Sequence, residues 1–159
     1  MNSVDNSTLN NLLKSLRNDY PEVRWKKSER FSWDPSQKTI YYDPSGQDPK
    51  WSLLHEAGHM SKQHNTYRND LNLLKMEVEA WDEAKHLATV YGETIDQDHI
   101  EDCLDSYRDW LYKRSQCPKC SQNGIEQSSG NYRCINCRHQ WTVTENRFCR
   151  VYRKSKTPH

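Results

Sequence analysis

The sequence predicts an α+β protein in which a small antiparallel sheet packs with four helices and a separate β module follows. Three observations favour this class. Apolar residues recur at helical spacing in four segments, residues 22–42 are aromatic-rich and strand-like, and the composition changes after residue 112. Although 33% of the 159 residues are hydrophobic, six Trp and nine Tyr provide large apolar surfaces. We therefore expect a small, aromatic-rich core.

The first helix is expected from about Ser7 to Asp19. Either Ser7 or Thr8 can cap its start, and Pro21 cannot continue it. Its apolar side has the spacing i, i+3, i+4 and i+7 and consists of Leu9, Leu12, Leu13 and Leu16.

An antiparallel hairpin is expected between residues 22 and 42. The segments RFSW and KTIYY have the aromatic and β-branched residues of strands. The sequence Asp-Pro-Ser-Gln at 34–37 separates them and favours a turn.

Three further helices follow. Asp48 and Pro49 supply a cap and a proline at the first helical position, which marks the start of the second helix. The third helix is expected at about 69–91, where Gly92 stops it, and the fourth at about 96–114.

The charge of the chain is divided unevenly along its length. Residues 1–112 carry 13 Lys and Arg against 20 Asp and Glu, whereas residues 113–159 carry 10 against 2. The net charges of −7 and +8 predict two modules, at residues 1–114 and 115–159. No stretch approaches 18 consecutive apolar residues, and the N-terminus lacks the pattern of a secretory signal. We therefore expect a cytoplasmic protein with no membrane partner.

The second helix carries the segment WSLLHEAGHM, in which two histidines stand four residues apart. His55 and His59 leave the same helical face, so both can bind one metal ion. Glu56 is rotated by about 100° and reaches the same site from its edge, as a general base acting on bound water must. The alternative is that the two histidines are partly buried and bond to backbone carbonyls.

Glu79, on the third helix, is expected to be the third metal ligand. It lies twenty residues past His59, where an antiparallel helix pair can bring a carboxylate to the two histidines. Glu83, one turn later, is placed to bond the free ring nitrogen of His55 or His59. Glu77 competes as a ligand, but it is displaced by about 200° from Glu79, and we interpret it as a solvated surface acid.

His64 is an alternative third ligand. If the helix continues past His59, His64 lies about 180° from His55 and cannot share its ion. An H-E-x-x-H motif followed shortly by another histidine resembles the metzincins and the Spartan-type proteases. The resemblance to metzincins implies a glycine that turns the chain at this point, and residues 61–63 contain none. We therefore favour Glu79 over His64.

The segment HEAGH, followed by a glutamate helix that reads EAWDEA, resembles the gluzincin zinc metallopeptidases and most of all the single-domain minigluzincins. The resemblance spans roughly residues 5–112 in element order, and its specific part is His55, Glu56, His59 and Glu79. It implies a catalytic zinc, a peptide or protein substrate, and an enzyme that is latent as isolated. The cysteine-rich tail departs from the family pattern.

The same resemblance implies that an extended substrate binds along the strand before the motif helix. In this sequence that strand is KTIYY, and the residues expected to bind substrate are Thr39, Ile40 and Tyr41.

Two Cys-x-x-Cys pairs occupy the C-terminal module, thirteen residues apart: Cys117, Cys120, Cys134 and Cys137. This is metal-ligand spacing and not disulfide spacing. Four thiolates leave no open coordination position, so we expect a structural zinc in a zinc ribbon. A module of about 40 residues could not fold on hydrophobic burial alone. In total we expect two zinc ions per chain, one catalytic and one structural.

The ribbon interleaves basic and aromatic residues, which favours contacts with nucleic acid. The basic residues are Arg133, Arg138, Arg147, Arg150, Arg153, Lys154 and Lys156, and the aromatic residues are Tyr132, Trp141, Phe148 and Tyr152. Recognition of a protein substrate and intramolecular docking on the acidic module remain alternatives. Cys103 is interpreted as a core residue and Cys149 as a strand residue that could cap the catalytic zinc.

The leading prediction is a zinc metalloendopeptidase that a basic zinc ribbon targets or restrains. The alternative prediction is a nucleic-acid or protein-binding zinc module whose HEAGH site is structural or degenerate.

Overall fold

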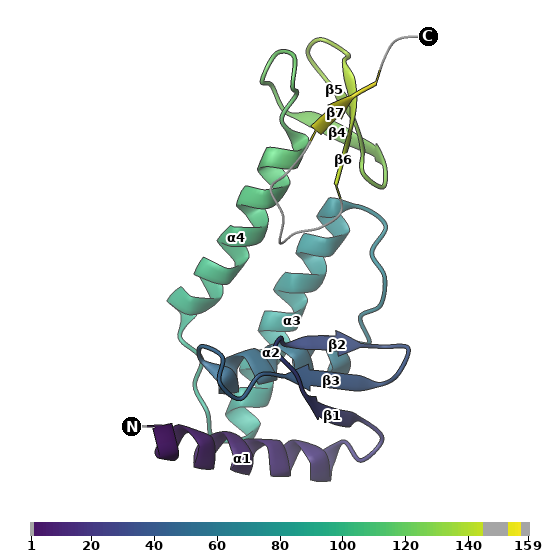
Figure 1. Cartoon of the computed structure of the whole chain (residues 1–159). Helices are drawn as coiled ribbons and strands as arrows, with labels where there is room; N and C mark the ends of the chain where they lie inside the picture. The colour runs from purple at the N-terminus through teal and green to yellow at the C-terminus, as the bar shows by residue number, and fades with distance from the viewer. Residues whose placement is uncertain (1, 145–152, 157–159) are drawn as a thin grey trace. The chain divides into compact units, whose positions relative to one another are not determined.

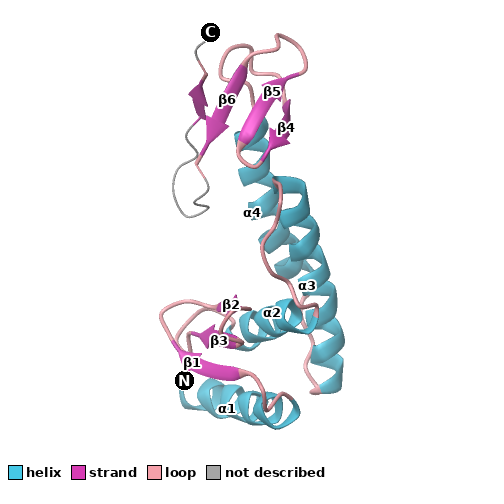
Figure 2. Ribbon diagram, turned by 90° about the vertical axis from the view of Figure 1, so that its right-hand side faces the viewer, coloured by secondary structure: helices cyan, strands magenta, loops and turns pink. Residues whose placement is uncertain are grey.

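The protein is described from a computed structural model, which covers residues 2–144 and 153–156, with side chains from residue 8 onward. The described chain has four helices, a three-stranded mixed sheet and a four-stranded antiparallel sheet, so the α+β class is confirmed (Figures 1 and 2). It divides into two compact units. Residues 1–65 and 76–100 form the first, which we call the HEAGH unit, and residues 66–75 and 101–159 form the second, the cysteine unit.

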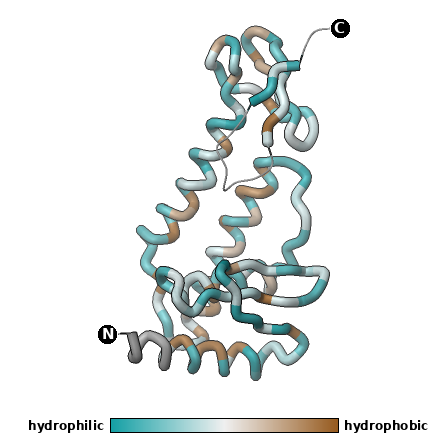
Figure 3. Tube along the Cα trace, in the orientation of Figure 1, coloured by the Kyte–Doolittle hydropathy of each residue, from teal (hydrophilic) through white to brown (hydrophobic). Residues whose placement is uncertain are grey.

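The helices agree closely with the predicted ranges. They are α1 (Asn2–Asp19), α2 (Pro49–Ser61), α3 (Asp70–Val90) and α4 (Gln97–Ser115). Helix α1 begins several residues earlier than expected, and its leucine side is buried. The same periodicity appears as alternating brown and teal along α1 in Figure 3. Helix α2 starts after Asp48 as predicted, although the Asp48 side chain makes no capping hydrogen bond.

The sheet of the HEAGH unit is mixed, which corrects the prediction of an antiparallel sheet. Its strands are β1 (Arg24–Lys27), β2 (Ser32–Asp34) and β3 (Thr39–Tyr42), in the order β1-β3-β2. Strand β3 runs antiparallel to β2 and parallel to β1. The chain therefore crosses from one edge of the sheet to the other before it fills the middle.

The predicted turn between β2 and β3 is confirmed. The side-chain oxygen Oδ1 of Asp34 accepts hydrogen bonds from the backbone N–H of Ser36 at 2.9 Å and of Gln37 at 3.1 Å. This local pattern replaces backbone hydrogen bonds in a tight reversal. Helix α2 then packs beside β2 and β3, and Ile40 in the middle of the sheet is fully buried.

The cysteine unit contains an antiparallel sheet of four strands in sequence order. They are β4 (Gly124–Ser128), β5 (Asn131–Cys134), β6 (Gln140–Val143) and β7 (Arg153–Ser155). Its core combines two buried cysteines, Cys117 and Cys134, with Tyr132 and Trp141. The rings of Tyr132 and Trp141 stack with centroids 5.6 Å apart.

The two units divide the chain differently from the predicted modules at 1–114 and 115–159. Asp70 and Arg114, which are both buried, belong to the cysteine unit. Arg114 Nε donates to Asp70 Oδ2 at 2.7 Å and Arg114 Nη2 to Asp70 Oδ1 at 3.1 Å, while the Tyr132 hydroxyl donates to the same carboxylate. Trp141 Nε1 donates to the Arg114 carbonyl at 2.9 Å. The N-terminal end of α3 and the C-terminal end of α4 are therefore part of the core of the cysteine unit.

None of the helices within the described ranges is long and apolar enough to cross a membrane.

Candidate metal centres

The two histidines of HEAGH converge on one carboxylate of helix α3. His55 Nε2 lies 3.1 Å from Glu77 Oε2, and His59 Nε2 lies 3.2 Å from Glu77 Oε1. The side chain of His55 is 13% exposed, that of His59 12% and that of Glu77 5%. One ligand atom from each lies within 4.8 Å of the others, so the group could hold a metal ion.

Gly58 explains how close α2 and α3 come at this site. A Cβ atom added to Gly58 would lie 2.2 Å from the backbone oxygen of Ala80, well inside the distance that real Cβ atoms keep. A glycine within a helix costs about 1 kcal/mol relative to alanine, so it usually has a packing reason. The glycine of HEAGH is therefore the signal in the sequence that marks this close approach.

The chemistry of the donor set fits zinc. Bonds of about 2.0–2.1 Å to a tetrahedral zinc ion separate neighbouring N and O ligands by about 3.3 Å. The distance from His55 Nε2 to Glu77 Oε2 is 3.1 Å and that from His59 Nε2 to Glu77 Oε1 is 3.2 Å, both close to this value. His55 Nε2 and Glu77 Oε2 are buried and, despite their separation of 3.1 Å, have no hydrogen bond of proper geometry. Buried polar atoms are rarely left unsatisfied. A cation between them would satisfy both, and two histidines with one glutamate form a set typical of catalytic zinc.

The electrostatics of the metal-free cluster are those of an ion pair. Burial alone would lower the pKa of His55, but the carboxylates of Glu56 and Glu77 raise it to about 9. Burial would raise the pKa of Glu77, whereas the two imidazoles hold that pKa well below its usual range. The carboxylate is therefore ionised, as a metal ligand must be.

Glu79, expected to be the third ligand, is not in the group of side chains that could hold a metal ion, whereas Glu77 is. The Glu79 side chain is 43% exposed, and its Oε2 lies 3.1 Å from His64 Nε2. Residues two apart on a helix point about 200° away from each other, so only one of the two glutamates can face the cluster. Glu77, interpreted from the sequence as a surface acid, is 4% exposed and faces it.

Glu83 also lies elsewhere than predicted. It accepts a hydrogen bond from Ser61 Oγ at 2.8 Å and pairs with Lys62 Nζ at 3.4 Å. Glu83 therefore contacts the end of α2 and not the ring nitrogens of His55 and His59. The reason is that Glu83 lies on the face of α3 that carries Glu79, and not on the face that carries Glu77.

His64 folds back toward His59, although it does not join the metal-binding group. Helix α2 ends at Ser61, and Gln63 takes the left-handed conformation with φ of 55°. The turn that seemed to require glycine is thus made by Gln63. His64 Nδ1 lies 2.9 Å from His59 Nδ1. Burial lowers the pKa of His64, against the opposing effect of Glu79.

Glu56 lies beside His55, near the ring nitrogen that does not face Glu77. Its Oε1 lies 3.6 Å from His55 Nδ1, and its side chain is 12% exposed. The ring of His55 stacks on Trp81 with centroids 4.2 Å apart and an interplanar angle of 14°. His55 is therefore held by an aromatic face and a neighbouring carboxylate.

Thr39, Ile40 and Tyr41 do not form a free strand edge. Because β3 is the middle strand, its backbone pairs with β1 on one side and β2 on the other. Thr39 and Ile40 are also fully buried. The expected pairing of an extended peptide with this strand therefore has no unpaired backbone edge to use at these residues. The sequence showed which segments are strands but not their order.

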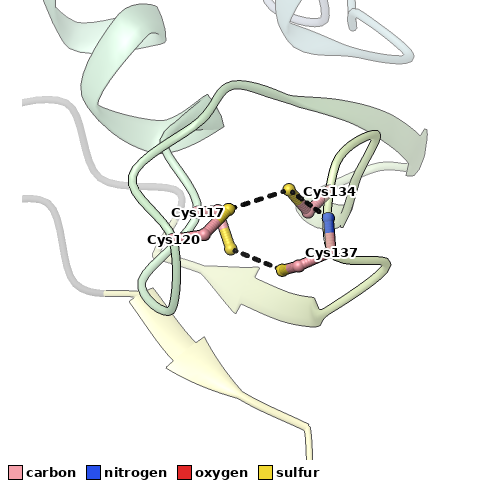
Figure 4. A group of neighbouring side chains, drawn as sticks. All are labelled: Cys117, Cys120, Cys134 and Cys137. Carbon is pink, nitrogen blue, oxygen red and sulfur yellow. Dashed lines mark hydrogen bonds between the residues drawn. The ribbon is translucent and has the colours of Figure 1, made fainter.

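The second group that could hold a metal consists of Cys117, Cys120, Cys134 and Cys137, which Figure 4 shows pointing toward one another. The Sγ atoms of Cys117 and Cys137 are 3.7 Å apart, and those of Cys120 and Cys134 are 3.4 Å apart. Zinc–sulfur bonds of about 2.3 Å in a tetrahedron separate the sulfurs by about 3.8 Å. Four thiolates at these distances fit zinc without an open position.

Each Cys-x-x-Cys pair forms a turn of the same design. The backbone N–H of Lys119 donates to Cys117 Sγ at 3.4 Å, and that of Asn136 donates to Cys134 Sγ at 3.4 Å. The residue after each pair, Ser121 or Arg138, is left-handed, with φ of 65° and 63°. Backbone N–H donors toward sulfur stabilise thiolates, which are the form that binds metal.

Of the four aromatic residues proposed for base stacking, the two within the described residues are not available on the surface. Tyr132 and Trp141 are 4% and 0% exposed and belong to the core. Of the basic residues proposed for these contacts, those within the described ranges are exposed, namely Arg133, Arg138, Arg153, Lys154 and Lys156. Cys103 is half-buried on α4. Residues 145–152, which include Arg147, Phe148, Cys149, Arg150 and Tyr152, lie outside the described residues.

No family model, no curated protein and no solved structure matches this chain.

Proposed function

We propose that the protein is a zinc metallopeptidase of gluzincin type, with a catalytic zinc held by His55, His59 and Glu77. The observation that carries this proposal is the convergence of both Nε2 atoms on the two oxygens of Glu77, at 3.1 and 3.2 Å. A buried His-His-Glu set on two packed helices, with Glu56 beside it in the H-E-x-x-H motif, is the arrangement that peptide hydrolysis by zinc needs.

The proposed reaction adds water to the carbonyl carbon of a peptide bond and breaks its C–N bond. His55, His59 and Glu77 would hold the zinc ion, which when bound would supply a Lewis acid that lowers the pKa of water toward about 7 and polarises the carbonyl. Glu56 accepts the proton that the water loses and delivers a proton to the leaving amine. His55, His59 and Glu77 act by staying fixed, because Trp81 stacks on one imidazole and Gly58 keeps the helices close.

The cysteine cluster is proposed to hold a second, structural zinc. Four thiolates close the coordination sphere, so this ion has no position for substrate. The contribution of such an ion is the free energy of folding of the small sheet around it.

Zinc stoichiometry in a matched pair of variants tests the site. The wild-type chain should bind two zinc ions, Glu77→Ala should bind one, and Glu79→Ala should still bind two in zinc excess. Two zinc ions in Glu77→Ala, or a loss in Glu79→Ala alone, would show that the wrong glutamate has been assigned.

Glu56→Gln tests the chemistry separately from the metal. This variant should keep two zinc ions and lose hydrolysis of a labelled, unfolded protein whose fragments are identified by mass spectrometry. Equal cleavage by Glu56→Gln and wild type would refute the mechanism. Because a latent enzyme could be inactive as isolated, cleavage should also be measured after limited proteolysis of the full chain.

The second candidate function is a binding module, and one surface of the cysteine unit favours it. Ile125 and Ile135 are 56% and 68% exposed, and with Arg133 and Arg138 they line a hollow of about 260 Å³. Apolar side chains beside arginines suit an acidic partner that also buries apolar surface. Under this function, the wild-type chain should bind one zinc ion. Arg133→Ala should weaken the binding of single-stranded nucleic acid or of an acidic peptide. Glu56→Gln should change neither the zinc content nor the binding of that partner.

A further inference from the structure

Three side chains form a chain of polar contacts that starts at His59 and leads away from Glu77. His59 Nδ1 lies 2.9 Å from His64 Nδ1, and His64 Nε2 lies 3.1 Å from Glu79 Oε2. His59 thus contacts Glu77 with one ring nitrogen and His64 with the other. We call the three side chains His59, His64 and Glu79 the relay.

The relay has one arrangement of protons that satisfies every member. If Nε2 of His59 binds a metal ion, its proton must be on Nδ1, where it can be donated to His64. Nδ1 of His64 must then accept, so its proton is on Nε2. That N–H donates to the carboxylate of Glu79, which only accepts. Each imidazole is neutral in one defined tautomer.

The backbone holds His64 in this place independently of the metal. The N–H of His64 donates to the carbonyl of His59 at 3.0 Å, and Trp33 Nε1 donates to the carbonyl of His64 at 3.1 Å. Gln63 supplies the left-handed turn between them, with φ of 55°. His64 is 9% exposed, so its imidazole is fixed before any ion binds.

We propose that His64 and Glu79 are positioning residues, which fix the tautomer and orientation of His59 as a metal ligand. The inference rests on the proposed function in that the ion is held by His55, His59 and Glu77. A metal-bound histidine whose other nitrogen donates to a fixed acceptor is a stronger base toward the ion and rotates less. The two ligands are then held differently, since His55 has the face of Trp81 and His59 has the relay.

The decisive pair of variants is His64→Leu and His64→Asn. Leucine removes the acceptor and keeps an apolar side chain, whereas asparagine can place Oδ1 near the position of Nδ1 and accept the same proton. We expect His64→Leu to lower zinc affinity at the HEAGH site by about 10- to 100-fold, as loss of such partners does elsewhere. His64→Asn should recover most of that loss. Affinity is measured on the zinc-loaded full chain by competition with a weak chelator, dipicolinate.

A spectroscopic measurement separates positioning from a merely structural role. Long-range ¹H–¹⁵N NMR spectra of the zinc-loaded chain identify which ring nitrogen carries the proton. We expect His59 to be protonated at Nδ1 and His64 at Nε2. In His64→Leu, the Nδ1 proton of His59 should lose its hydrogen-bonded shift and exchange faster with water. A proton on Nε2 of His59, or on Nδ1 of His64, would overturn the proposal.

Glu79 is tested with a matched control on the same helix. Glu79→Leu should weaken zinc binding less than His64→Leu does. Glu79→Gln should weaken it even less, because the glutamine oxygen can still accept a hydrogen bond from His64 Nε2. Glu83→Gln is the control, because Glu83 contacts Ser61 and Lys62 and not the relay. Unchanged affinity in both His64→Leu and Glu79→Leu would refute the inference.

The outcomes also distinguish this inference from the proposed function. One zinc ion in the wild-type chain would refute the proposed site and, with it, the basis of the relay. Two zinc ions in wild type with no response to His64→Leu would refute the relay alone. Complete loss of one zinc ion in His64→Leu, even in zinc excess, would make His64 a direct ligand and overturn its assignment as a positioning residue.

Discussion

Replacing Gly58 by alanine should open the contact between α2 and α3 and damage the proposed metal site without changing a proposed ligand. The added Cβ would lie 2.2 Å from the Ala80 carbonyl oxygen, while ordinary contacts begin at 3.4 Å. The helices must therefore separate locally by about 1 Å, because a backbone carbonyl cannot rotate away as a side chain could.

The expected cost follows from two opposing terms. Overpacking costs about 1–3 kcal/mol, and the rigid partner places this case near the upper end. The gain in helix propensity from glycine to alanine is about 1 kcal/mol. The net free energy of unfolding should therefore fall by about 2 kcal/mol. Metal ligands tolerate displacements of about 0.2 Å, so a shift of Glu77 by about 1 Å should also weaken zinc binding strongly.

The assay combines urea unfolding with zinc competition on the full chain. Ser52→Ala, on the same helix, is the control and should change neither quantity by more than a few tenths of a kcal/mol. The double variant Gly58→Ala with Ala80→Gly should not recover, because the clash is with the backbone of residue 80. If Gly58→Ala binds zinc like wild type and unfolds at the same or higher urea concentration, the close approach does not position Glu77.

Three other predictions follow from contacts within one unit or the other. In the metal-free chain, the pKa of His55 is about 9 in the folded state, against 6.5 in the unfolded state. The stabilisation that His55 contributes to folding is therefore complete below pH 6.5 and is lost as the pH rises through 9. Urea unfolding at several pH values checks this slope, which should be missing in His55→Gln. Arg114→Met should cost about 3–5 kcal/mol by leaving Asp70 buried without its cation. The control Arg108→Met, in an exposed pair, should cost at most about 1 kcal/mol. Ser121→Gly and Arg138→Gly should each stabilise the cysteine unit by about 0.5 kcal/mol, because both residues are left-handed. Slower zinc release to a chelator would support this, and faster release in both would contradict it.

The sequence was sufficient where spacing along one element decides the outcome. His55 and His59 lie on one face because they are four residues apart on a helix, and the four cysteines meet because each pair forms its own local turn. The helices and the Asp34 turn were predicted for the same reason, since their signals are short-range.

The sequence was insufficient where two elements must be placed against each other. Periodicity showed that Glu77 and Glu79 point to opposite faces of α3, but it could not show which face meets α2. Spacing along the chain and the family resemblance favoured Glu79, whereas the structure brings Glu77 to the two histidines. Likewise, the middle position of β3 depends on a parallel partner fifteen residues earlier in sequence, which no local pattern encodes.

The middle position of β3 also bears on the order in which the HEAGH unit folds. The pairing of β2 with β3 spans a four-residue turn, whereas β1 must join β3 across an intervening strand. Local pairings close faster, because they lose less chain entropy. We therefore expect the hairpin to form first and β1 to dock on it. The register of the whole sheet would then be set by Asp34, and a slip of one residue would turn Ile40, which is fully buried, toward the opposite face.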